Sequence, residues 1–407
     1  MTTTTVDRDP QLKGQLKNVI LATLASMVGF WGWTMIGPLA KSYYKDAFHL
    51  SPGQLSLLIA MPVIVGAVAR IPVGAMTDRF GGRVMFTGML VLTSAMVLIV
   101  GLVGAFTTSF PLLLAVAFFL GIGGAIFAVG VPFSASWYEP HRKGLATGIF
   151  GMGMIGTAVA AFFNPRMLKA LGYFPTHVTI ACIAFAYAIV VWFMMKDSPK
   201  TAGRTPEPMM PKILAATKNI STWQLCFIYA VVFGAFVAFS NYLPTYMSNV
   251  YNFESVQAGT FAALFATCAV IARPFGGVAA DKVGPRPVTI VMFCAIAVLS
   301  VLIALQFGSA WAYFSLFILM AVFIGFGTGT VFGWVGRASK PEETGTVGGL
   351  VSAAGGLGGY FPPLIMGAVY GMNGHYFWAQ IALMGAALVS LAISFMIKNG
   401  GKPTVSK

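Results

Sequence analysis

Long apolar segments alternate with short polar loops along most of the chain. Twelve of these segments reach the roughly 20 residues that a helix needs to cross a bilayer. They form two groups of six, separated by a polar stretch at 196–221. The pattern contains no series of ten-residue alternating strands, so the sequence predicts an all-α polytopic membrane protein. The predicted spans are 18–40, 54–77, 84–105, 109–134, 144–164 and 173–195, then 222–249, 256–280, 287–307, 310–335, 344–371 and 376–396.

The composition agrees with this pattern and excludes a soluble globular protein. Hydrophobic residues make up 57% of the chain, charged residues make up 9%, and the mean hydropathy is +0.82. The formal net charge of +14 is compatible with nucleic-acid binding, but the basic residues lie in short loops between apolar segments. Membrane topology explains that placement, so we expect the lipid bilayer, and no nucleic acid, as a partner. We also expect a monomer.

The distribution of lysine and arginine predicts the orientation of the chain. Of the 25 residues, nineteen lie on one side of the predicted membrane and two lie within spans. The other side has only Lys41, Lys45, Arg166 and Lys169. Because basic loops are retained in the cytoplasm, we expect both termini and the stretch 196–221 to be cytoplasmic. The protein is therefore expected in the cytoplasmic (inner) membrane.

Six spans return the chain to the side on which it started, so both groups should share one orientation. The sequence thus predicts an N-terminal six-helix half at 1–195, a cytoplasmic linker at 196–221 and a C-terminal six-helix half at 222–407. Prolines and basic residues in the linker are typical of a tether, and a short surface helix is expected over Lys212–Asn219.

A repeated stretch supports two related halves and contains the main candidate for chemistry. Residues 69–83 and 272–286 align at an offset of 203, which pairs Arg70 with Arg273. Each arginine precedes an aspartate by eight residues, so a helix that ends at the aspartate places the arginine about 12 Å inside the membrane. An arginine there costs roughly 3 kcal/mol, and two without an acidic partner indicate an anion site. A structural alternative is that both arginines bond backbone carbonyls at broken helices.

The same stretch carries a family resemblance. The pattern Gly74-x-x-x-Asp78-Arg79-x-Gly81-x-Arg83 has a second copy that ends at Arg286. Both copies resemble the signature of loops 2–3 and 8–9 in the major facilitator superfamily. The resemblance implies the major facilitator fold, with twelve transmembrane helices in two six-helix halves that work by alternating access.

Glycine-rich sequence narrows the resemblance to one family. Residues 127–133, with Trp137-Tyr138 and 144–148, resemble the nitrate signature of the nitrate/nitrite porter family, and 347–363 resembles its second copy. The resemblance extends over nearly all of the chain and is closest to the actinobacterial-type members. It implies a carrier for nitrate and nitrite.

This resemblance also implies a site in which two arginines hold a planar monoanion below an aromatic ring. Carried over to this sequence, the arginines are Arg70 and Arg273, the hydroxyl donor is Tyr229 and the ring is Phe127. Met154 stands where the better-known branch has asparagine, so one neutral hydrogen-bond donor is missing. The chemistry supports the assignment independently, because a guanidinium offers forked donors to a planar oxyanion and a lysine does not.

Other classes of chemistry find little support in the sequence. Glycine runs in spans four, five, ten and eleven indicate closely packed helices and a narrow path lined by backbone. The pattern Gly151-x-Gly153-x-x-Gly156 matches a dinucleotide fingerprint, but it lies inside a span, so no cofactor is expected. A buried nucleophile or a metal cluster is not apparent, and we therefore expect a carrier and no enzyme.

The coupling mode is inferred by subtraction. None of the eleven acidic residues lies deep in a predicted span, and all four histidines (His49, His141, His177 and His375) are assigned to loops. A buried proton relay is therefore not visible, which favours nitrate/nitrite antiport. Proton-coupled nitrate symport and transport of another small anion, such as formate or cyanate, remain the alternatives.

Aromatic residues in spans one and seven are mostly interpreted as core packing. A further hypothesis is that some of them, such as Phe236 or Phe239, close a periplasmic gate.

Overall fold

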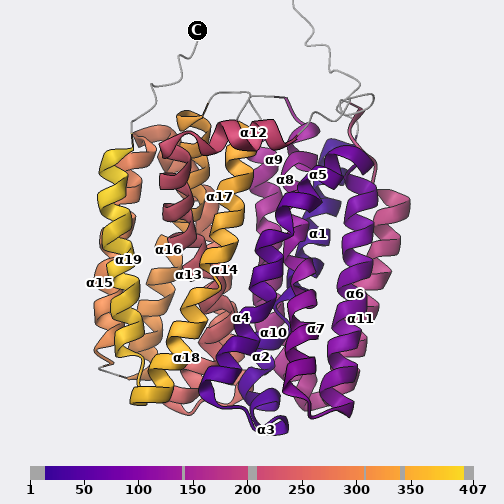
Figure 1. Cartoon of the computed structure of the whole chain (residues 1–407), viewed down its shortest axis with the longest axis vertical. Helices are drawn as coiled ribbons and strands as arrows, with labels where there is room; N and C mark the ends of the chain where they lie inside the picture. Colours follow the sequence, from indigo (N-terminus) through magenta and orange to yellow (C-terminus); the bar gives the residue numbers. More distant parts are fainter. Residues whose placement is uncertain (1–13, 140–142, 200–208, 307–308, 340–343, 398–407) are drawn as a thin grey trace, which may run out of the picture.

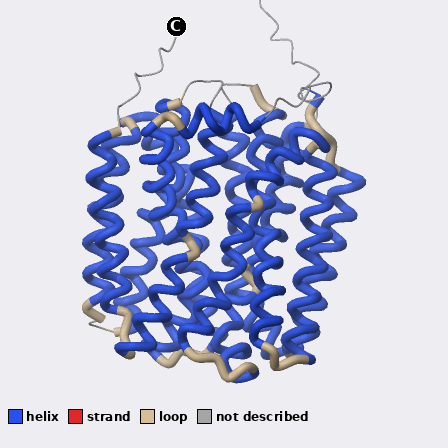
Figure 2. The backbone as a smooth tube through the Cα atoms, viewed as in Figure 1, coloured by secondary structure: helices blue, strands red, loops and turns tan. Residues whose placement is uncertain are grey.

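The computed structural model describes residues 14–139, 143–199, 209–306, 309–339 and 344–397. Within these ranges the chain is helical and contains no strand, which confirms the predicted all-α class (Figure 2). A helix pairs its backbone N–H and C=O groups within itself. Lipid offers these groups no other partners, so membrane-spanning segments need this arrangement.

The first half of the chain forms five long helical rods and one rod with a pronounced bend. Its elements are α1 (Gln15–Trp33), α2 (Ile36–Leu39), the π-helical turn η2 (Ala40–Tyr44), α3 (Lys45–Ala47), α4 (Pro52–Val68), α5 (Arg70–Phe80), α6 (Gly82–Phe106), α7 (Phe110–Leu120), the 3₁₀ turn η3 (Gly121–Ala125), α8 (Ile126–Ser136), α9 (Lys143–Gly151), the 3₁₀ turn η5 (Met152–Ile155), α10 (Gly156–Leu171) and α11 (Tyr173–Met194).

The second half begins with a short helix in the stretch predicted as a linker, close to the surface helix expected at 212–219. Its elements are α12 (Met209–Thr217), α13 (Ile220–Tyr251), α14 (Ser255–Val283), α15 (Pro285–Ala304), α16 (Ala310–Ala338), α17 (Thr344–Gly358), α18 (Phe361–Asn373) and α19 (Phe377–Met396).

The helices agree with the predicted membrane spans. In the described chain, ten helices are long and apolar enough to cross a membrane, or eleven if the bent pair α4 and α5 counts as one span. The remaining predicted span, 344–371, is divided into α17 and α18 by a turn at Gly359 and Tyr360. Glycine and proline at this point explain the interruption, since neither favours a continuous helix.

Helices from the two halves of the sequence occupy opposite sides of the bundle (Figure 1). The indigo-to-magenta helices lie to the right, the orange and yellow helices lie to the left, and α12 lies across the upper end. The upper end is called the α12 side below. The lower end, where α3 and α18 lie, is called the α3 side.

Glycine allows the helices to touch backbone to backbone, as the glycine runs predict. A β-carbon on Gly329 of α16 would lie 2.0 Å from the carbonyl oxygen of Arg273 in α14. No side chain fits there, so α14 and α16 approach as closely as two helices can. This contact fixes the backbone that carries Arg273.

Hydrogen bonds join the two halves on the α3 side. Three such bonds are present there, in addition to the contacts that the central arginines make across the halves. The bundle is therefore closed toward α3. The three bonds run from Lys41 Nζ to the Ser248 carbonyl (2.7 Å), from Ser56 Oγ to Tyr242 Oη (3.2 Å) and from Arg166 Nη2 to Thr260 Oγ1 (2.8 Å).

One assignment from the sequence is wrong. His177 was expected in a loop, but it lies in the second turn of α11 and is fully buried. Its Nδ1 lies 2.9 Å from the Tyr173 carbonyl and its Nε2 lies 3.3 Å from Tyr44 Oη. The apolar run that begins at 173 includes this histidine because the Tyr44 hydroxyl and the Tyr173 carbonyl satisfy its two ring nitrogens. His49 and His375 do lie outside helices, and His141 lies outside the described residues.

Candidate functional site

Arg70 lies where the second predicted span bends. The chain turns by 41° at Ala69, and Arg70 is the first residue of α5. Its side chain is only 4% exposed. Nε donates to the Gly66 carbonyl at 3.1 Å, and Nη1 donates to the carbonyl and the hydroxyl of Ser352 in α17 at 2.7 and 2.9 Å. Three bonds therefore hold this guanidinium in place.

One nitrogen of Arg70 is left over. Nη2 is buried and has no hydrogen-bond partner in the described part of the chain. The structural alternative of carbonyl-bonded arginines thus holds for part of Arg70, because two carbonyls accept from it, but it does not account for Nη2. A buried charged donor without an acceptor costs at least about 1 to 3 kcal/mol, so this nitrogen is suited to an anionic ligand.

Arg273 is held much more loosely. It lies inside the continuous helix α14 and is only partly buried. Nη1 contacts the sulfur of Met154 at 2.7 Å, and Nη2 lies 3.5 Å from Tyr229 Oη, at the outer limit of a hydrogen bond. A thioether is a weak acceptor, so most of the hydrogen-bonding capacity of Arg273 stays available.

Phe127 lies between the two arginines. The centre of its ring is 5.5 Å from the Cζ atom of Arg70 and 5.6 Å from that of Arg273. Both distances are within the range of cation–π contact, so the two Cζ atoms are at most about 11 Å apart. Each arginine also faces a second ring, Phe233 at 5.5 Å from Arg70 and Phe332 at 5.6 Å from Arg273.

The arginines reach across to the opposite half of the chain. Arg70, from the first half, contacts α17, and Arg273, from the second half, contacts the 3₁₀ turn η5. A β-carbon on Gly356 would lie 2.8 Å from that of Ala67 and 3.6 Å from Arg70 Cζ. On the other side, a β-carbon on Gly151 would lie 3.7 Å from Arg273 Nε. The guanidinium groups therefore pack directly against glycine backbone.

The structure brings the four residues singled out from the sequence into one cluster. Arg70, Arg273, Tyr229 and Phe127 are linked through the contacts above, and none of the described carboxylates lies within 4 Å of either guanidinium. Their role as ligands for a substrate stays a prediction. Electrostatically the cluster is two like charges in a low-dielectric setting, and such an arrangement attracts an anion.

Sequence reasoning missed three members of this cluster: Phe233, Phe332 and Ser352. Phe233 follows Tyr229 by one helical turn, and their rings stack with centres 5.1 Å apart. That spacing was a usable signal for Phe233. Ser352 lies inside a glycine run of α17, and only the crossing of the halves reveals its contact with Arg70.

The proposed gate aromatics differ in their surroundings. Phe239 packs on Phe265 and Phe317, which both belong to the second half of the chain. Phe236 packs on Phe233, next to the arginine cluster. The α3-side contact between the halves involves a neighbour of these residues, Tyr242, whose hydroxyl accepts from Ser56.

Comparison with known proteins agrees with the fold and the sequence patterns. The family model of the Major Facilitator Superfamily matches residues 22–363 and again 225–406. A "Probable nitrate/nitrite transporter NarK2" of Mycobacterium tuberculosis is 46% identical over 380 residues, which cover 93% of this chain and 95% of that protein. The "Nitrite extrusion protein" of Bacillus subtilis is 34% identical and covers 92% of each chain.

Solved structures support the fold alone. A bacterial homologue of the human lysosomal transporter Spinster, in an inward-facing and unoccupied conformation, superimposes with a TM-score of 0.72 at 19% identity. That match covers 96% of this chain and 97% of the other. The human organic anion transporter MFSD10 gives a TM-score of 0.69 at 16% identity and covers 93% and 99% of the two chains.

A helical bundle of this kind, with a buried cationic centre where its halves meet, defines a multi-pass membrane transporter of the major facilitator superfamily. The sequence identity and coverage of the two relatives narrow the assignment further. Within the superfamily, the chain belongs to the nitrate/nitrite porter family.

Proposed function

We propose that the protein moves nitrate and nitrite across the cytoplasmic membrane and exchanges one for the other by alternating access. The observation that carries the proposal is the pair of arginines around Phe127, in which the buried Arg70 Nη2 has no acceptor among the described residues. The names of the relatives, a nitrate/nitrite transporter and a nitrite extrusion protein, support the choice of anion.

The proposed substrate binds between the two guanidinium groups, with Tyr229 as a hydroxyl donor and Phe127 as the aromatic ring. A planar oxyanion can accept two parallel bonds from a guanidinium fork. Two unit charges at most about 11 Å apart repel by at least about 1.5 kcal/mol at an effective dielectric of about 20. A monoanion between Arg70 and Arg273 removes that repulsion, so substrate favours a state in which the halves are closed around it.

Exchange follows from the same electrostatics. An empty carrier has to bring two like charges together when it closes, whereas either bound anion offsets their repulsion. The return step is therefore fast only when a substrate is bound, and obligatory exchange results. No proton relay is needed for this cycle.

The proposal also includes the membrane orientation, the two six-helix halves and the remaining expectations from the sequence. The excess of lysine and arginine supports cytoplasmic termini and a cytoplasmic α12 side. With that orientation, the α3 side faces the periplasm, and three hydrogen bonds between the halves close the described conformation on that side. The working units are 1–195 and 222–407, joined by the linker 196–221, and we propose a monomeric carrier without a cofactor or an enzymatic activity.

Counterflow in proteoliposomes tests the proposal. External nitrite should accelerate the efflux of preloaded nitrate in the absence of a pH gradient, and formate and cyanate should compete weakly. Arg70→Lys and Arg273→Lys should each lose this acceleration, because a lysine cannot form the bidentate contact. Arg204→Lys in the linker is the matched control. Wild-type nitrate affinity in either central variant would refute the guanidinium clamp.

One observation favours proton-coupled nitrate symport as a second candidate. His177 is a buried titratable group inside α11, hydrogen-bonded to Tyr44. A symporter would accumulate nitrate when only a pH gradient is imposed, and a His177→Gln variant would abolish that accumulation. An exchanger would show no accumulation without internal nitrite.

A further inference from the structure

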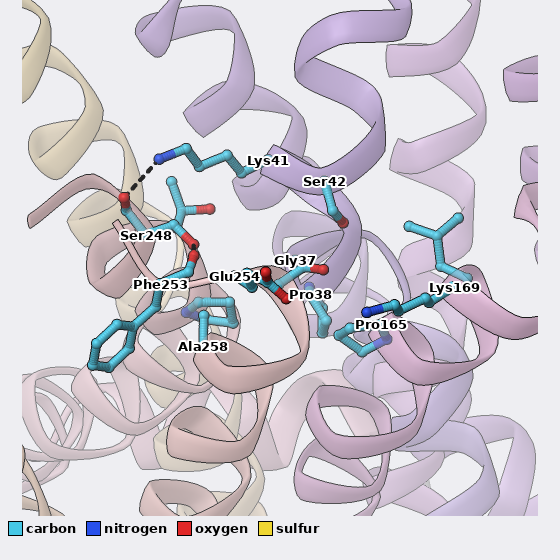
Figure 3. A pocket seen from close by; sticks show the side chains of 14 residues that line it. Gly37, Pro38, Lys41, Ser42, Pro165, Lys169, Ser248, Phe253, Glu254 and Ala258 are labelled. Carbon is cyan, nitrogen blue, oxygen red and sulfur yellow. Dashed lines mark hydrogen bonds between the residues drawn. The ribbon is translucent and has the colours of Figure 1, made fainter. Parts of the chain in front are cut away.

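A cavity on the α3 side lies between the two halves, on the opposite side of the closed contacts from the arginine cluster. Its volume is about 430 Å³, which is within the usual range of small-molecule sites. Both halves contribute to its walls, and the residues that matter here are Lys41, Lys169, Thr245, Glu254 and Ser255. Figure 3 shows Lys41 and Lys169 on opposite sides of the cavity, with Glu254 between them in this view.

The wall of the cavity carries an excess of positive charge. Two of the four basic residues that the sequence places on this side line it, against the single carboxylate of Glu254. Lys169 makes no hydrogen bond or ion pair with any described residue. Lys41 makes one bond to the described chain, at 2.7 Å from its Nζ to the carbonyl of Ser248 in the other half. Both ammonium groups therefore have N–H donors to offer.

Two further groups add hydrogen-bond donors to this region. Ser255 is the first residue of the 29-residue helix α14, and Glu254, at the N-cap position, gives no side-chain cap. The N-terminal N–H groups of α14 and their dipole are therefore directed to the cavity region. The hydroxyl of Thr245, a residue only 2% exposed, is buried and has no partner in the described ranges.

We propose that this cavity is a second anion site, an outer vestibule that binds small monovalent anions between Lys41 and Lys169. An anion bound there attracts the Lys41 ammonium and draws it away from the Ser248 carbonyl. Lys41 lies in the π-helical turn η2, and its bond to Ser248 is one of the three that close the α3 side. An anion in the vestibule thus weakens the contacts that close the α3 side. These contacts have to open before the anion can reach the central site.

The vestibule differs from the central site in its selectivity. Ammonium groups are point charges without the planar fork of a guanidinium. The vestibule therefore selects by charge and accepts chloride as well as nitrate. Only its assignment to the outer face, and its effect on nitrate uptake, rest on the proposed function.

Sided transport assays test the effect on uptake. Lys169→Gln should raise the external nitrate concentration for half-maximal exchange about fivefold, leave the internal value unchanged and reduce the inhibition by external chloride. Lys45→Gln is the matched control, since Lys45 lies in α3 on the same side but does not line the cavity. Equal effects of the two substitutions, or none from Lys169→Gln, would overturn the vestibule.

A binding assay separates this proposal from the transport function. The Arg70→Lys/Arg273→Lys double variant, in phosphatidylcholine nanodiscs, should retain one nitrate-binding event by titration calorimetry, displaceable by chloride. Adding Lys169→Gln should remove it. A double variant that binds no anion refutes the vestibule even if wild-type exchange is intact. Chloride binding that appears only after delipidation in detergent would assign the cavity to a lipid phosphate and also refute the proposal.

If the double variant still binds nitrate but the wild-type protein does not exchange nitrate, the proposed function is refuted and the vestibule is supported.

Discussion

The two arginines come from matching positions of a repeat, yet their surroundings differ. Arg70 is buried and makes three hydrogen bonds, two of them to Ser352 in the opposite half. Arg273 is partly exposed and contacts a thioether and a distant hydroxyl. The repeat supplies two equivalent arginines, and their different neighbours hold Arg70 firmly and leave Arg273 free to adjust.

This difference suggests a division of work. A pre-organised donor loses little entropy when a ligand binds, so Arg70 should set affinity. A loosely held donor can follow the ligand as the halves move, so Arg273 should matter more for the conformational step. Substitutions at paired positions can break or sharpen this comparison.

The largest difference is expected between the lysine substitutions of the two arginines. Arg70→Lys loses the fork and leaves buried carbonyls without donors, which at about 3 kcal/mol corresponds to roughly 100-fold weaker nitrate binding. Arg273→Lys loses weaker contacts and should cost about 10-fold in binding but more in exchange rate. Equilibrium binding and counterflow on both variants provide the measurement. Equal losses in affinity would mean that the two sites are equivalent.

The two glycines that face the arginines, Gly356 near Arg70 and Gly151 near Arg273, give the next largest contrast. A β-carbon on Gly356 meets the β-carbon of Ala67 at 2.8 Å and its α-carbon at 3.1 Å, whereas on Gly151 it meets only atoms at 3.7 Å or beyond. Overpacking of this kind costs about 1 to 3 kcal/mol, so Gly356→Ala should weaken nitrate binding about 10-fold or more. Gly151→Ala should change it less than about twofold, since no overlap has to be relieved. A strong loss of nitrate binding in Gly151→Ala would show that the closely packed glycine contact lies beside Arg273 and not beside Arg70.

Ser352→Ala tests how Arg70 is held in place. The substitution removes one charge-assisted bond of 2.9 Å and should raise the half-saturating nitrate concentration about 10-fold, from a loss of about 1.5 kcal/mol. Ser390→Ala is the control, because the Ser390 hydroxyl is also buried but has no described partner. An unchanged transport constant in Ser352→Ala would show that the two carbonyl bonds suffice.

Met154→Leu should have the smallest effect. Leucine has a similar volume but removes the sulfur contact with Arg273, which as a weak interaction is worth about 0.5 kcal/mol, or roughly a twofold change in nitrate affinity. Met154→Asn offers Arg273 an amide oxygen and should make it resemble Arg70, with tighter binding and slower exchange. Faster exchange in the asparagine variant would contradict the adaptable role of Arg273.

Much of the fold could be predicted from the chain. The apolar segments predicted the long helices, and the 203-residue repeat predicted two equivalent arginines inside them. The error at His177 has a simple cause: a single polar residue near the end of an apolar run is compatible with a loop or with a buried partner. Sequence alone does not reveal that Tyr44 lies opposite.

The site was predictable only in part. Arg70, Arg273, Tyr229 and Phe127 were identified from motifs and family resemblance, and they do lie together. The difference in burial and hydrogen bonding between Arg70 and Arg273 was not visible in the sequence, because it depends on which residue of the opposite half faces each guanidinium. Ser352 and Met154 are more than 100 positions away from the arginines they contact.

The amino-acid sequence by itself determined that the chain is a helical membrane protein with an arginine inside the apolar sequence of each half, since burial of apolar segments and the cost of a charge in lipid depend on local composition. Tertiary structure decided how the two cations differ and where Lys41 and Lys169 form a shared cavity. These features arise where helices from different halves meet, and contacts between distant segments are set by packing, which a local pattern does not encode.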